Sequence, residues 1–459
     1  MKQVMLGNEA IARGAYEAGC SVASAYPGTP STEILQNLSK YKEVYSEWSV
    51  NEKVAAEVAI GASMAGARAM AAMKHFGMNV ASDAVFPSVY IGATGGLVYV
   101  CADDPGMNSS GTEPDSRHFA PHMKMPMLEP ADSQECKDFT KRAFELSEQF
   151  DTPFMLRTTV RVNHGSSIVT LEDRVEVPVK HYERDIMKNT NIPALARNKH
   201  KTVEERLVRL QEFSNETDLN RVELHDTKIG VICAGICYQY AREVFGDGAS
   251  YLKLGFTYPM PDRKIREFAA QVDKLYVLEE LDPFIEDYVR GLGIECTGKA
   301  VLPLYLEYSA DIIRRDARLN AIYLANFGCV NDSMYPRFFS REMGEKPFLL
   351  LEIDEHSAEA GVVTRCEAFL DAVANFDAAR EIAPRRTRKI EFDPGGDRVL
   401  YLPHAANGMA VWAAALRAHG INAKLLPPPD ERSLEWGRRC LDGKECLPCT
   451  LMTGDMVRL

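Results

Sequence analysis

Helical patterns alternate with short apolar runs over about the first 165 residues, and this alternation constrains the fold more than any other feature. Residues 7–18 have the pattern of a helix, whereas residues 21–25 and 97–102 have the composition of buried strands. Such an alternation is typical of a parallel sheet wrapped by helices. The fold class predicted for this region is therefore α/β.

The length of the chain predicts several domains, because 459 residues exceed the size at which a single hydrophobic core stops growing. Further strand-like runs at 229–234, 274–280, 321–326 and 347–353 predict additional α/β domains. A segment rich in Lys, Arg and Glu separates the first domain from the second and favours a solvated helix. The expected parts are an α/β domain at 1–175, a helical linker at 176–226, an α/β domain at 227–318 and an α/β region at 319–459.

The charge balance and the cysteine content exclude several classes of protein. A formal net charge of −12 disfavours a nucleic-acid-binding surface, which depends on clustered Lys and Arg. No window has the roughly 18 uninterrupted apolar residues of a membrane helix. The 11 cysteines are scattered and odd in number, unlike a secreted disulfide framework, so we expect reduced thiols and a cytoplasmic protein.

Residues 51–73 are predicted to form one helix that is rich in small side chains. Small residues allow another helix to approach closely, so this helix is expected at a buried interface. Glu52 begins the helix, where the dipole favours a carboxylate, and Lys74 and His75 end it, where the dipole favours cations. Ordinary complementation of the helix dipole is therefore an alternative to a functional role for these three side chains.

Two loops follow predicted strands. Residues 26–31 (YPGTPS) form a turn, and Ser31 or Thr32 is expected to cap the next helix, so that polar groups face a helix N-terminus. Residues 103–117 form a polar loop after the strand at 97–102. In open α/β sheets, ligands bind beyond the carboxyl ends of the strands, so this second loop is a candidate site.

Three segments, NEKVAAEVAIGA at 51–62, YPGTPS at 26–31 and ADDPGM at 102–107, resemble the α-subunits of indolepyruvate:ferredoxin oxidoreductases in sequence and in order. The likeness runs from residue 1 to about residue 318. The resemblance implies a thiamine-diphosphate-dependent 2-oxoacid:ferredoxin oxidoreductase whose first domain binds the pyrimidine of the cofactor. It also implies oxidative decarboxylation of indolepyruvate or another aryl pyruvate to an acyl-CoA.

Glu52 matches the carboxylate that contacts N1′ of the cofactor aminopyrimidine in this family. The thiazolium C2 proton is weakly acidic, and the imino tautomer of the aminopyrimidine supplies the internal base that removes it. Glu57 competes for the role, but five residues further along a helix it faces another direction. The resemblance also implies that Tyr26, Pro27 and Gly28 contact the cofactor.

The same resemblance implies four residues at the substrate. Thr29 matches a position beside the substrate, although a plain turn residue is the alternative. Lys74 and His75 resemble a Lys-His pair that holds the oxoacid carboxylate. Arg117 is a further candidate for that carboxylate, because a guanidinium binds it through a bidentate fork.

Residues 228–318 resemble the transketolase C-terminal-like domain of the same family, through LGFTYP at 254–259 and EELDP at 279–283. The acidic residues of EELDP are interpreted as structural. Family members continue into a diphosphate-binding domain that holds Mg²⁺, and the one similar tripeptide, GDG at 246–248, is interpreted as a turn. We therefore expect a thiamine diphosphate half-site in an oligomer, with a β subunit and ferredoxin as partners and CoA and a 2-oxoacid as substrates.

From about residue 320 the chain resembles a different family, the C-terminal region of activators of 2-hydroxyacyl-CoA dehydratases. The matching motifs are ANFGC at 325–329, TRCEAFL at 364–370 and GKECLP at 443–448. This resemblance implies a 4Fe–4S cluster with Cys329, Cys366 and Cys446 as ligands, since thiolates suit iron. The lone CxxC that Cys446 forms with Cys449 is equally compatible with chance.

Three hypotheses follow from these two resemblances. The first is a subunit of a 2-oxoacid:ferredoxin oxidoreductase in which Glu52 activates the cofactor. The second is an iron–sulfur activator that serves acyl-CoA dehydration through its C-terminal cysteines. The third is a join of two gene pieces without a joint function, because the family changes near Asn320.

Overall fold

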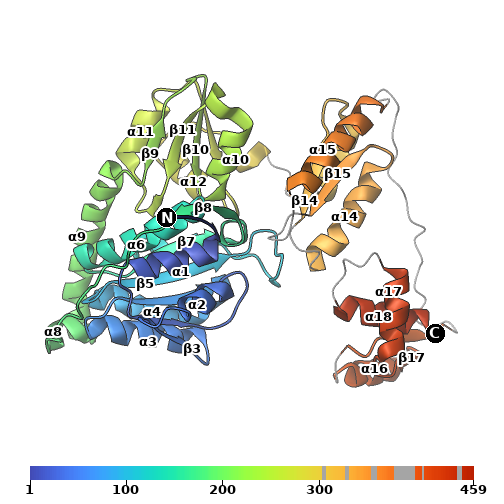
Figure 1. The fold of residues 1–459 in the computed structure, drawn as a ribbon, viewed down its shortest axis with the longest axis horizontal. Helices are drawn as coiled ribbons and strands as arrows, with labels where there is room; N and C mark the ends of the chain where they lie inside the picture. The colour runs from blue at the N-terminus through green and yellow to red at the C-terminus, as the bar shows by residue number, and fades with distance from the viewer. Residues whose placement is uncertain (302–305, 326–329, 353–358, 377–397, 406–407, 442–446) are drawn as a thin grey trace. The chain divides into compact units, whose positions relative to one another are not determined.

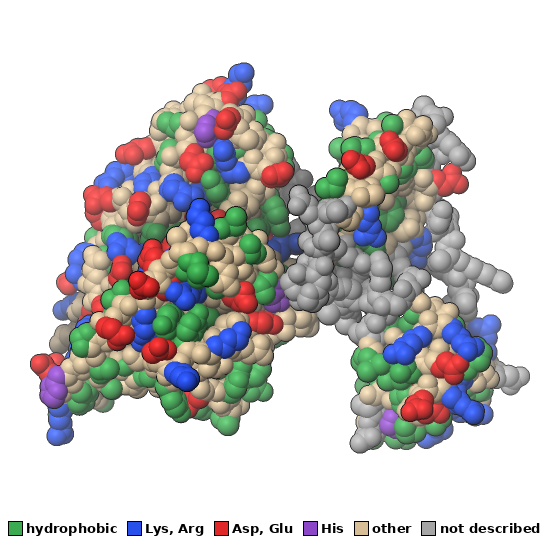
Figure 2. Space-filling view, viewed as in Figure 1, with side chains coloured by type: hydrophobic (Ala, Val, Ile, Leu, Met, Phe, Trp, Pro, Cys, Tyr) green, Lys and Arg blue, Asp and Glu red, His purple; other side chains and the backbone are tan. Residues whose placement is uncertain are grey.

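The computed structural model describes residues 1–301, 306–325, 330–352, 359–376, 398–405, 408–441 and 447–459. The chain divides into two compact units, Met1–Leu302 and Pro303–Leu459. None of the helices in these ranges is both long and apolar enough to cross a membrane. On the face shown in Figure 2, acidic and basic side chains are interspersed over the N-terminal unit.

The N-terminal unit is built on a seven-stranded sheet, of which β3, β5 and β7 are labelled in Figure 1. The spatial order of its strands is β12-β6-β7-β5-β4-β2-β3. Neighbouring strands are parallel except at the edge, where β12 runs antiparallel to β6. The predicted α/β fold class is confirmed. The strands are β2 (Val22–Ala25), β3 (Tyr45–Trp48), β4 (Ala69–Lys74), β5 (Leu97–Asp103), β6 (Met127–Leu128), β7 (Phe154–Thr159) and β12 (Phe256–Tyr258).

Helices cover both faces of this sheet, as is usual for parallel strands. Met70 and Ala72 of β4 lie in one core with α1, α2 and α6, whereas Ala71 and Met73 lie in the other core with α3, α4 and α5. Successive side chains of a strand point to opposite faces, so an almost wholly apolar strand serves both cores. These helices are α1 (Gly7–Glu17), α2 (Thr32–Leu38), α3 (Glu52–Met64), α4 (His75–Ile91), α5 (Phe119–Met123) and α6 (Ser133–Phe150).

A second sheet, with the order β13-β10-β11-β9, completes the N-terminal unit. Helix α10 packs on one face, and α11 and α12 pack on the other. The strands predicted at 229–234 and 274–280 are confirmed as β10 and β13. The elements are β9 (Arg221–Glu223), β10 (Ile229–Ala234), α10 (Ile236–Phe245), η2 (Gly246–Gly248), β11 (Ser250–Leu254), α11 (Asp262–Ala269), β13 (Lys274–Leu278), α12 (Phe284–Gly291) and η3 (Lys299–Val301).

A single residue, Gly255, separates β11 of the second sheet, which ends at Leu254, from β12 of the first sheet, which begins at Phe256. Asn220 fixes this crossing: its side-chain oxygen accepts hydrogen bonds from Gly255 N at 2.9 Å and Phe256 N at 2.8 Å. Helix α9 lies against α4 and β12. The remaining elements of the unit are β1 (Lys2–Leu6), η1 (Ser116–His118), α7 (Val160–Asn163), β8 (Ser166–Thr170), α8 (Ile186–Asn189) and α9 (Pro193–Glu216).

The C-terminal unit contains two pairs of parallel strands, β14 with β15 and β16 with β17. The strands predicted at 321–326 and 347–353 are confirmed as β14 and β15. The predicted domain boundaries at 175, 226 and 318 stay predictions. The elements are α13 (Leu306–Arg315), β14 (Ala321–Ala325), α14 (Val330–Met343), β15 (Phe348–Glu352), α15 (Glu359–Ala374), β16 (Leu400–Leu402), α16 (Met409–Ala418), β17 (Ala423–Leu425), α17 (Glu431–Cys440) and α18 (Leu447–Val457).

The single helix predicted for residues 51–73 is wrong, because α3 ends at Met64 and residues 69–74 form strand β4. Gly66 adopts a φ of +96°, which favours glycine and stops the helix. A Cβ at Gly66 would also lie 2.1 Å from the carbonyl oxygen of Lys180. The alanines and methionines that follow have good helix propensity, but their burial between β2 and β5 decides their conformation.

Gly14 lies at the contact between α1 and α6, and we expect a larger side chain there to destabilise the protein. A Cβ on Gly14 would lie 2.3 Å from the carbonyl oxygen of Lys137. We expect Gly14→Ala to lower the free energy of unfolding by about 1–3 kcal/mol, the usual cost of overpacking, as measured by urea denaturation. Gly61→Ala is the matched control: Gly61 is an exposed residue of α3 with no atom near its Cβ position, so stability should rise by up to about 1 kcal/mol. Equal midpoints for the two variants would contradict this account.

Candidate functional site

The candidate site lies where the order of the sheet reverses. The chain places β3 on one side of β2 and then β4 on the other, which makes β2 and β4 the switch point of the sheet. Ligands of open α/β sheets bind at the carboxyl ends of the strands at such a point. Because β2, β3, β4 and β5 are parallel, the segments that follow them share this edge, called the carboxyl edge below. These segments are the loop at 26–30, Glu52, Lys74 with His75, and the loop that begins at Asp104.

Glu52 is the first residue of α3, and only 9% of its surface is exposed. The Asn51 side chain caps the helix by accepting a hydrogen bond from Val54 N at 2.9 Å, which fixes the backbone at Glu52. Gly77 of α4 provides the space for the side chain, since a Cβ there would lie 2.6 Å from Glu52 Cγ. No group among the described residues donates a hydrogen bond to the Glu52 carboxylate. Glu57, the predicted competitor, is exposed.

The loop at residues 26–30 is held at both ends. Gly28 N donates to Thr32 Oγ1 at 2.9 Å, and the Asn8 side chain donates at 2.8 Å to the carbonyl of the last loop residue. Ser31 is the N-cap residue of α2, as predicted, but its hydroxyl donates to Gly28 O and makes no hydrogen bond to the helix. The loop brings the four predicted contact residues to the carboxyl edge: Tyr26, Pro27, Gly28 and Thr29.

Lys74 ends β4 and His75 begins α4, so the prediction that this pair ends a helix is wrong. Because neither residue lies at a helix C-terminus, complementation of a helix dipole there does not explain this pair. The Lys74 stem lies along Gly28, and its ammonium lies 5.1 Å from the centre of the Phe76 ring. No carboxylate of the described residues pairs with this ammonium within 4.0 Å. Burial lowers the pKa of Lys74, and the carboxylates of Asp104 and Glu52 oppose that shift.

His75 differs from Lys74 in its surroundings. Its side chain is buried, with 1% exposed. Burial, and then the nearby Lys74 ammonium, lower the pKa of His75 to about 4. The imidazole is therefore neutral at neutral pH, and Lys74 is the member of the pair that offers a cation to a carboxylate.

Asp104, which the sequence analysis did not single out, organises the loop after β5. Its carboxylate accepts hydrogen bonds from the backbone and side chain of both Asn108 and Ser109, at 2.7–3.1 Å. Ser109 Oγ also lies 3.5 Å from Thr29 O in the neighbouring loop. The sequence signal that was available is an Asp directly after a buried strand, followed by Asn and Ser.

Arg117 is buried and fully engaged with protein groups. Its guanidinium binds both carboxylate oxygens of Asp115, Glu279 Oε2 at 2.5 Å, and the backbone oxygens of Glu280 and Asp282 at 2.7 and 2.9 Å. Burial raises the pKa of Asp115, but hydrogen bonds and charge from Arg117 outweigh this and lower it to about 2. Arg117 thus joins the loop after β5 to the second sheet, and this geometry gives no support to its predicted role at the substrate carboxylate.

One group of possible metal ligands occurs in the described ranges. Asp115, His118 and Asp282 offer ligand atoms within 4.8 Å of one another. Asp115 is already paired with the Arg117 guanidinium, and a second cation beside that charge is unfavourable. We therefore infer no metal site at this group.

The predicted iron–sulfur ligands lie in the C-terminal unit. Cys366 is on α15 and is half-buried. Cys329 and Cys446 lie outside the described residues. The cluster stays a prediction.

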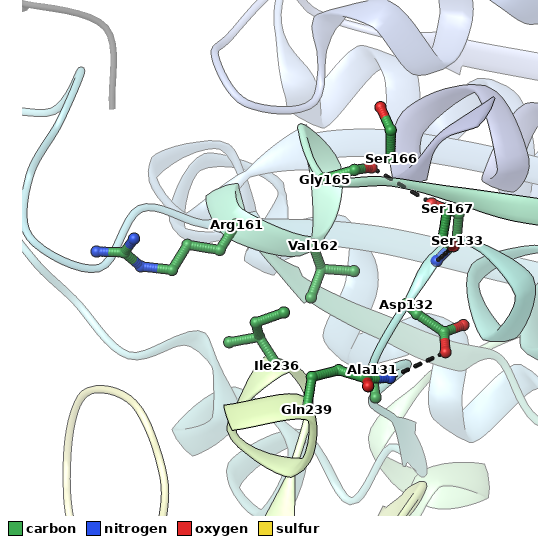
Figure 3. A pocket seen from close by; sticks show the side chains of 10 residues that line it. All are labelled: Ala131, Asp132, Ser133, Arg161, Val162, Gly165, Ser166, Ser167, Ile236 and Gln239. Atoms are coloured by element: carbon green, nitrogen blue, oxygen red, sulfur yellow. Dashed lines mark hydrogen bonds between the residues drawn. The ribbon is translucent and has the colours of Figure 1, made fainter. Parts of the chain in front are cut away.

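Two cavities of the N-terminal unit lie away from the predicted site residues. One, of about 290 Å³, is lined by residues of α6, α7, β8 and α10 (Figure 3). There the Gln239 side chain donates to Asp132 at 3.0 Å, and Arg161 points away from the other lining side chains. The other, of about 530 Å³, is lined mainly by apolar side chains, including Tyr258 and Tyr288. We place the candidate site at the carboxyl edge, because buried Glu52 and half-buried Lys74, neither of which has an ion-pair partner among the described residues, lie there.

The comparisons with known proteins identify the domain to which this edge belongs. Residues 13–220 match the family described as "Pyruvate flavodoxin/ferredoxin oxidoreductase, thiamine diP-bdg". These residues are therefore similar to the thiamine-diphosphate-binding domain of that family. A solved structure, 2-oxoglutarate:ferredoxin oxidoreductase from Magnetococcus marinus, shares the fold with a TM-score of 0.53 at 17% identity, covering 65% of this chain and 61% of that chain.

Curated relatives carry the name indolepyruvate oxidoreductase subunit IorA. The chain is 43% identical over 326 residues to that subunit of Archaeoglobus fulgidus, which covers 67% of this chain and 52% of the relative. It is 41% identical over 331 residues to that of Methanothermobacter thermautotrophicus, which covers 68% and 54%. The predicted resemblance to indolepyruvate oxidoreductase subunits is confirmed, and the chain spans about half the length of these relatives.

The contact between Gly77 and Glu52 predicts an energetic coupling. A Cβ at Gly77 would displace the Glu52 side chain, so Gly77→Ala should lower the free energy of unfolding by about 1–3 kcal/mol. Part of this loss should vanish in a Glu52→Ala background, with a coupling of at least about 0.5 kcal/mol in a double-mutant cycle. Gly61→Ala combined with Glu52→Ala should be additive. Additivity at Gly77 as well would contradict the contact.

We expect substitution of Arg117, whose guanidinium joins the loop after β5 to the second sheet, to cause a large loss of stability. Arg117→Met leaves the carboxylates of Asp115 and Glu279 buried without their cation, which should cost about 3–5 kcal/mol in urea denaturation. Lys53→Met is the control, because Lys53 pairs with Asp83 on the surface at 2.6 Å and its loss should cost less than about 1 kcal/mol. Similar small losses in both variants would show that the Arg117 guanidinium contributes little.

Proposed function

We propose that the carboxyl edge is the aminopyrimidine-binding half of a thiamine-diphosphate-dependent 2-oxoacid:ferredoxin oxidoreductase of the indolepyruvate type. One observation carries the proposal: Glu52 is a buried carboxylate, at the switch point of the sheet, to which no described residue donates a hydrogen bond. A protonated ring nitrogen is a suitable donor for such a group. The names of the relatives support the indolepyruvate class of substrate.

The residues of the chain fit the pyrimidine end of the cofactor. Glu52 holds a proton at N1′ of the aminopyrimidine, while Tyr26, Pro27 and Gly28 supply the loop against the ring. Gly77 leaves the space that the Glu52 side chain occupies, since a Cβ at position 77 would lie 2.6 Å from Glu52 Cγ. When bound, thiamine diphosphate supplies the nucleophilic carbon and the electron sink that 2-oxoacid decarboxylation requires.

Lys74 binds the carboxylate of the 2-oxoacid. It is a half-buried cation at the carboxyl edge without an ion-pair partner among the described residues. His75 is neutral and lines the site, and Thr29 is exposed in the adjacent loop. In the overall reaction the 2-oxoacid and CoA give the acyl-CoA, CO₂ and a proton, and two ferredoxins each accept one electron.

Partner polypeptides complete the enzyme. Large apolar side chains are exposed next to Glu52 in the sequence and at the same edge of the sheet, namely Tyr26, Trp48, Val50 and Phe76. Exposed apolar clusters mark interaction surfaces. We assign this rim to a diphosphate-binding domain that holds Mg²⁺ and the phosphates, with a β subunit and ferredoxin in the assembled oligomer.

Calorimetric titration tests the half-site. Thiamine diphosphate with Mg²⁺ is titrated into the purified chain, alone and mixed with a diphosphate-binding domain from an IorA relative. We expect binding in the mixture. Glu52→Gln should weaken it by about 10- to 100-fold, the effect of losing a hydrogen bond to a charged group, and Glu57→Gln should not change it. An absence of binding in the mixture contradicts the thiamine proposal, whereas binding that is unaffected by Glu52→Gln contradicts the role of Glu52.

A further inference from the structure

The register of the sheet places Asp104 beside Lys74. Lys74 is paired with Ala102 across the parallel strands β4 and β5. Asp104 follows Ala102 by two residues, and side chains two residues apart in extended chain share a face. The Asp104 carboxylate accordingly acts on the charge of Lys74, more strongly than Glu52 does.

The same carboxylate holds the loop that lies next to the substrate residue Thr29. Two donors from Asn108 bind Asp104 Oδ1, and two from Ser109 bind Oδ2. Burial raises the pKa of Asp104, but the hydrogen bonds that it accepts from the loop, chiefly from Ser109 N, outweigh burial and lower it. Asp104 is therefore a carboxylate at neutral pH.

The charge of Asp104 has no ion-pair partner among the described residues. Its side chain is buried, with 1% exposed, and no cation of the described residues lies within ion-pair distance. The hydrogen bonds of the loop stabilise this charge, and Lys74 is a cation on which it acts. The titratable groups that face Lys74 are Asp104 from the loop after β5, Glu52 from α3, and His75 from α4. His75 is neutral, and of the two carboxylates Asp104 acts more strongly in favour of the ammonium.

We infer that Asp104 is a positioning residue for the 2-oxoacid, because one buried carboxylate both lies beside Lys74 in the register of the strands and holds the loop that contacts Thr29. The inference rests on the proposed function, in which Lys74 binds the substrate carboxylate. In this inference Asp104 does not contact the substrate, but it acts on Lys74, the cation that does.

The pH dependence of the assembled enzyme tests the inference. We would measure kcat/KM for indolepyruvate as a function of pH, with thiamine diphosphate, Mg²⁺, the diphosphate-binding partner, CoA and a one-electron acceptor. Asp104→Asn removes the charge that raises the Lys74 pKa, so Lys74 should lose its proton at lower pH. The alkaline limb of the profile should move to lower pH by about one unit or more, with a raised KM. Ser109→Ala loosens the loop but keeps the charge, and it should leave the alkaline limb in place.

A second variant keeps the inference testable if Asp104→Asn does not fold. Lys74→Arg leaves Asp104 intact and replaces the ammonium by a guanidinium, which stays protonated at every pH of the assay. The alkaline limb should then disappear. An alkaline limb that is unchanged in Asp104→Asn, or that persists in Lys74→Arg, overturns the inference.

The variant Lys74→Met distinguishes a failure of the inference from a failure of the proposed function. If Lys74→Met leaves the KM for indolepyruvate unchanged, the proposed role of Lys74 is contradicted. The role of Asp104, which depends on it, is then contradicted too. If Lys74→Met raises the KM for indolepyruvate but the alkaline limb does not move in Asp104→Asn, the proposed role of Asp104 alone is contradicted.

Discussion

The parallel pairing of β4 with both β2 and β5 is the constraint on which the candidate site depends. Parallel strands end at the same edge, so the loops after β2, β4 and β5 meet although up to about 80 residues separate them. Ala23, Ala25, Ala71 and Ala72 of β2 and β4 are buried in the cores between the sheet and its covering helices. The site is thus a consequence of strand order, and the helices between the strands determine which side chains stand at its entrance.

Charged side chains near this edge fall into two kinds. Arg117 and Arg157 are surrounded by carboxylates: Arg157 binds Asp103 at 2.9 Å and Glu129 at 2.8 Å, and Arg117 binds Asp115 and Glu279. Each of these guanidiniums is paired with two carboxylates within the protein, which suits a structural role. Glu52 and Lys74 have no such partners among the described residues. The degree to which a buried charge is satisfied therefore separates groups that stabilise the fold from groups that await a ligand.

The sequence predicted the elements whose patterns are local and failed where the outcome depends on distant partners. Buried strands at 97–102 and 229–234 follow from composition, and Glu52 follows from a resemblance. The run Ala69–Lys74 was assigned to a helix because its propensity favours one, although the glycine at 66 offered a stop signal. The partner of Arg117, Glu279, lies 162 residues away, and no pattern near either residue announces their contact. The neutral state of His75 likewise comes from tertiary burial, which a sequence does not display.

The one-residue crossing at Gly255 limits how the N-terminal unit can be divided. Strand β12, which closes the edge of the first sheet against β6, comes from beyond β9, β10 and β11 of the second sheet. A fragment that ends anywhere before residue 256 lacks this edge strand and leaves the backbone of β6 open to pairing with other chains. Recombination between relatives that keeps the first sheet whole must therefore also carry β9, β10 and β11 of the second sheet, as far as residue 258.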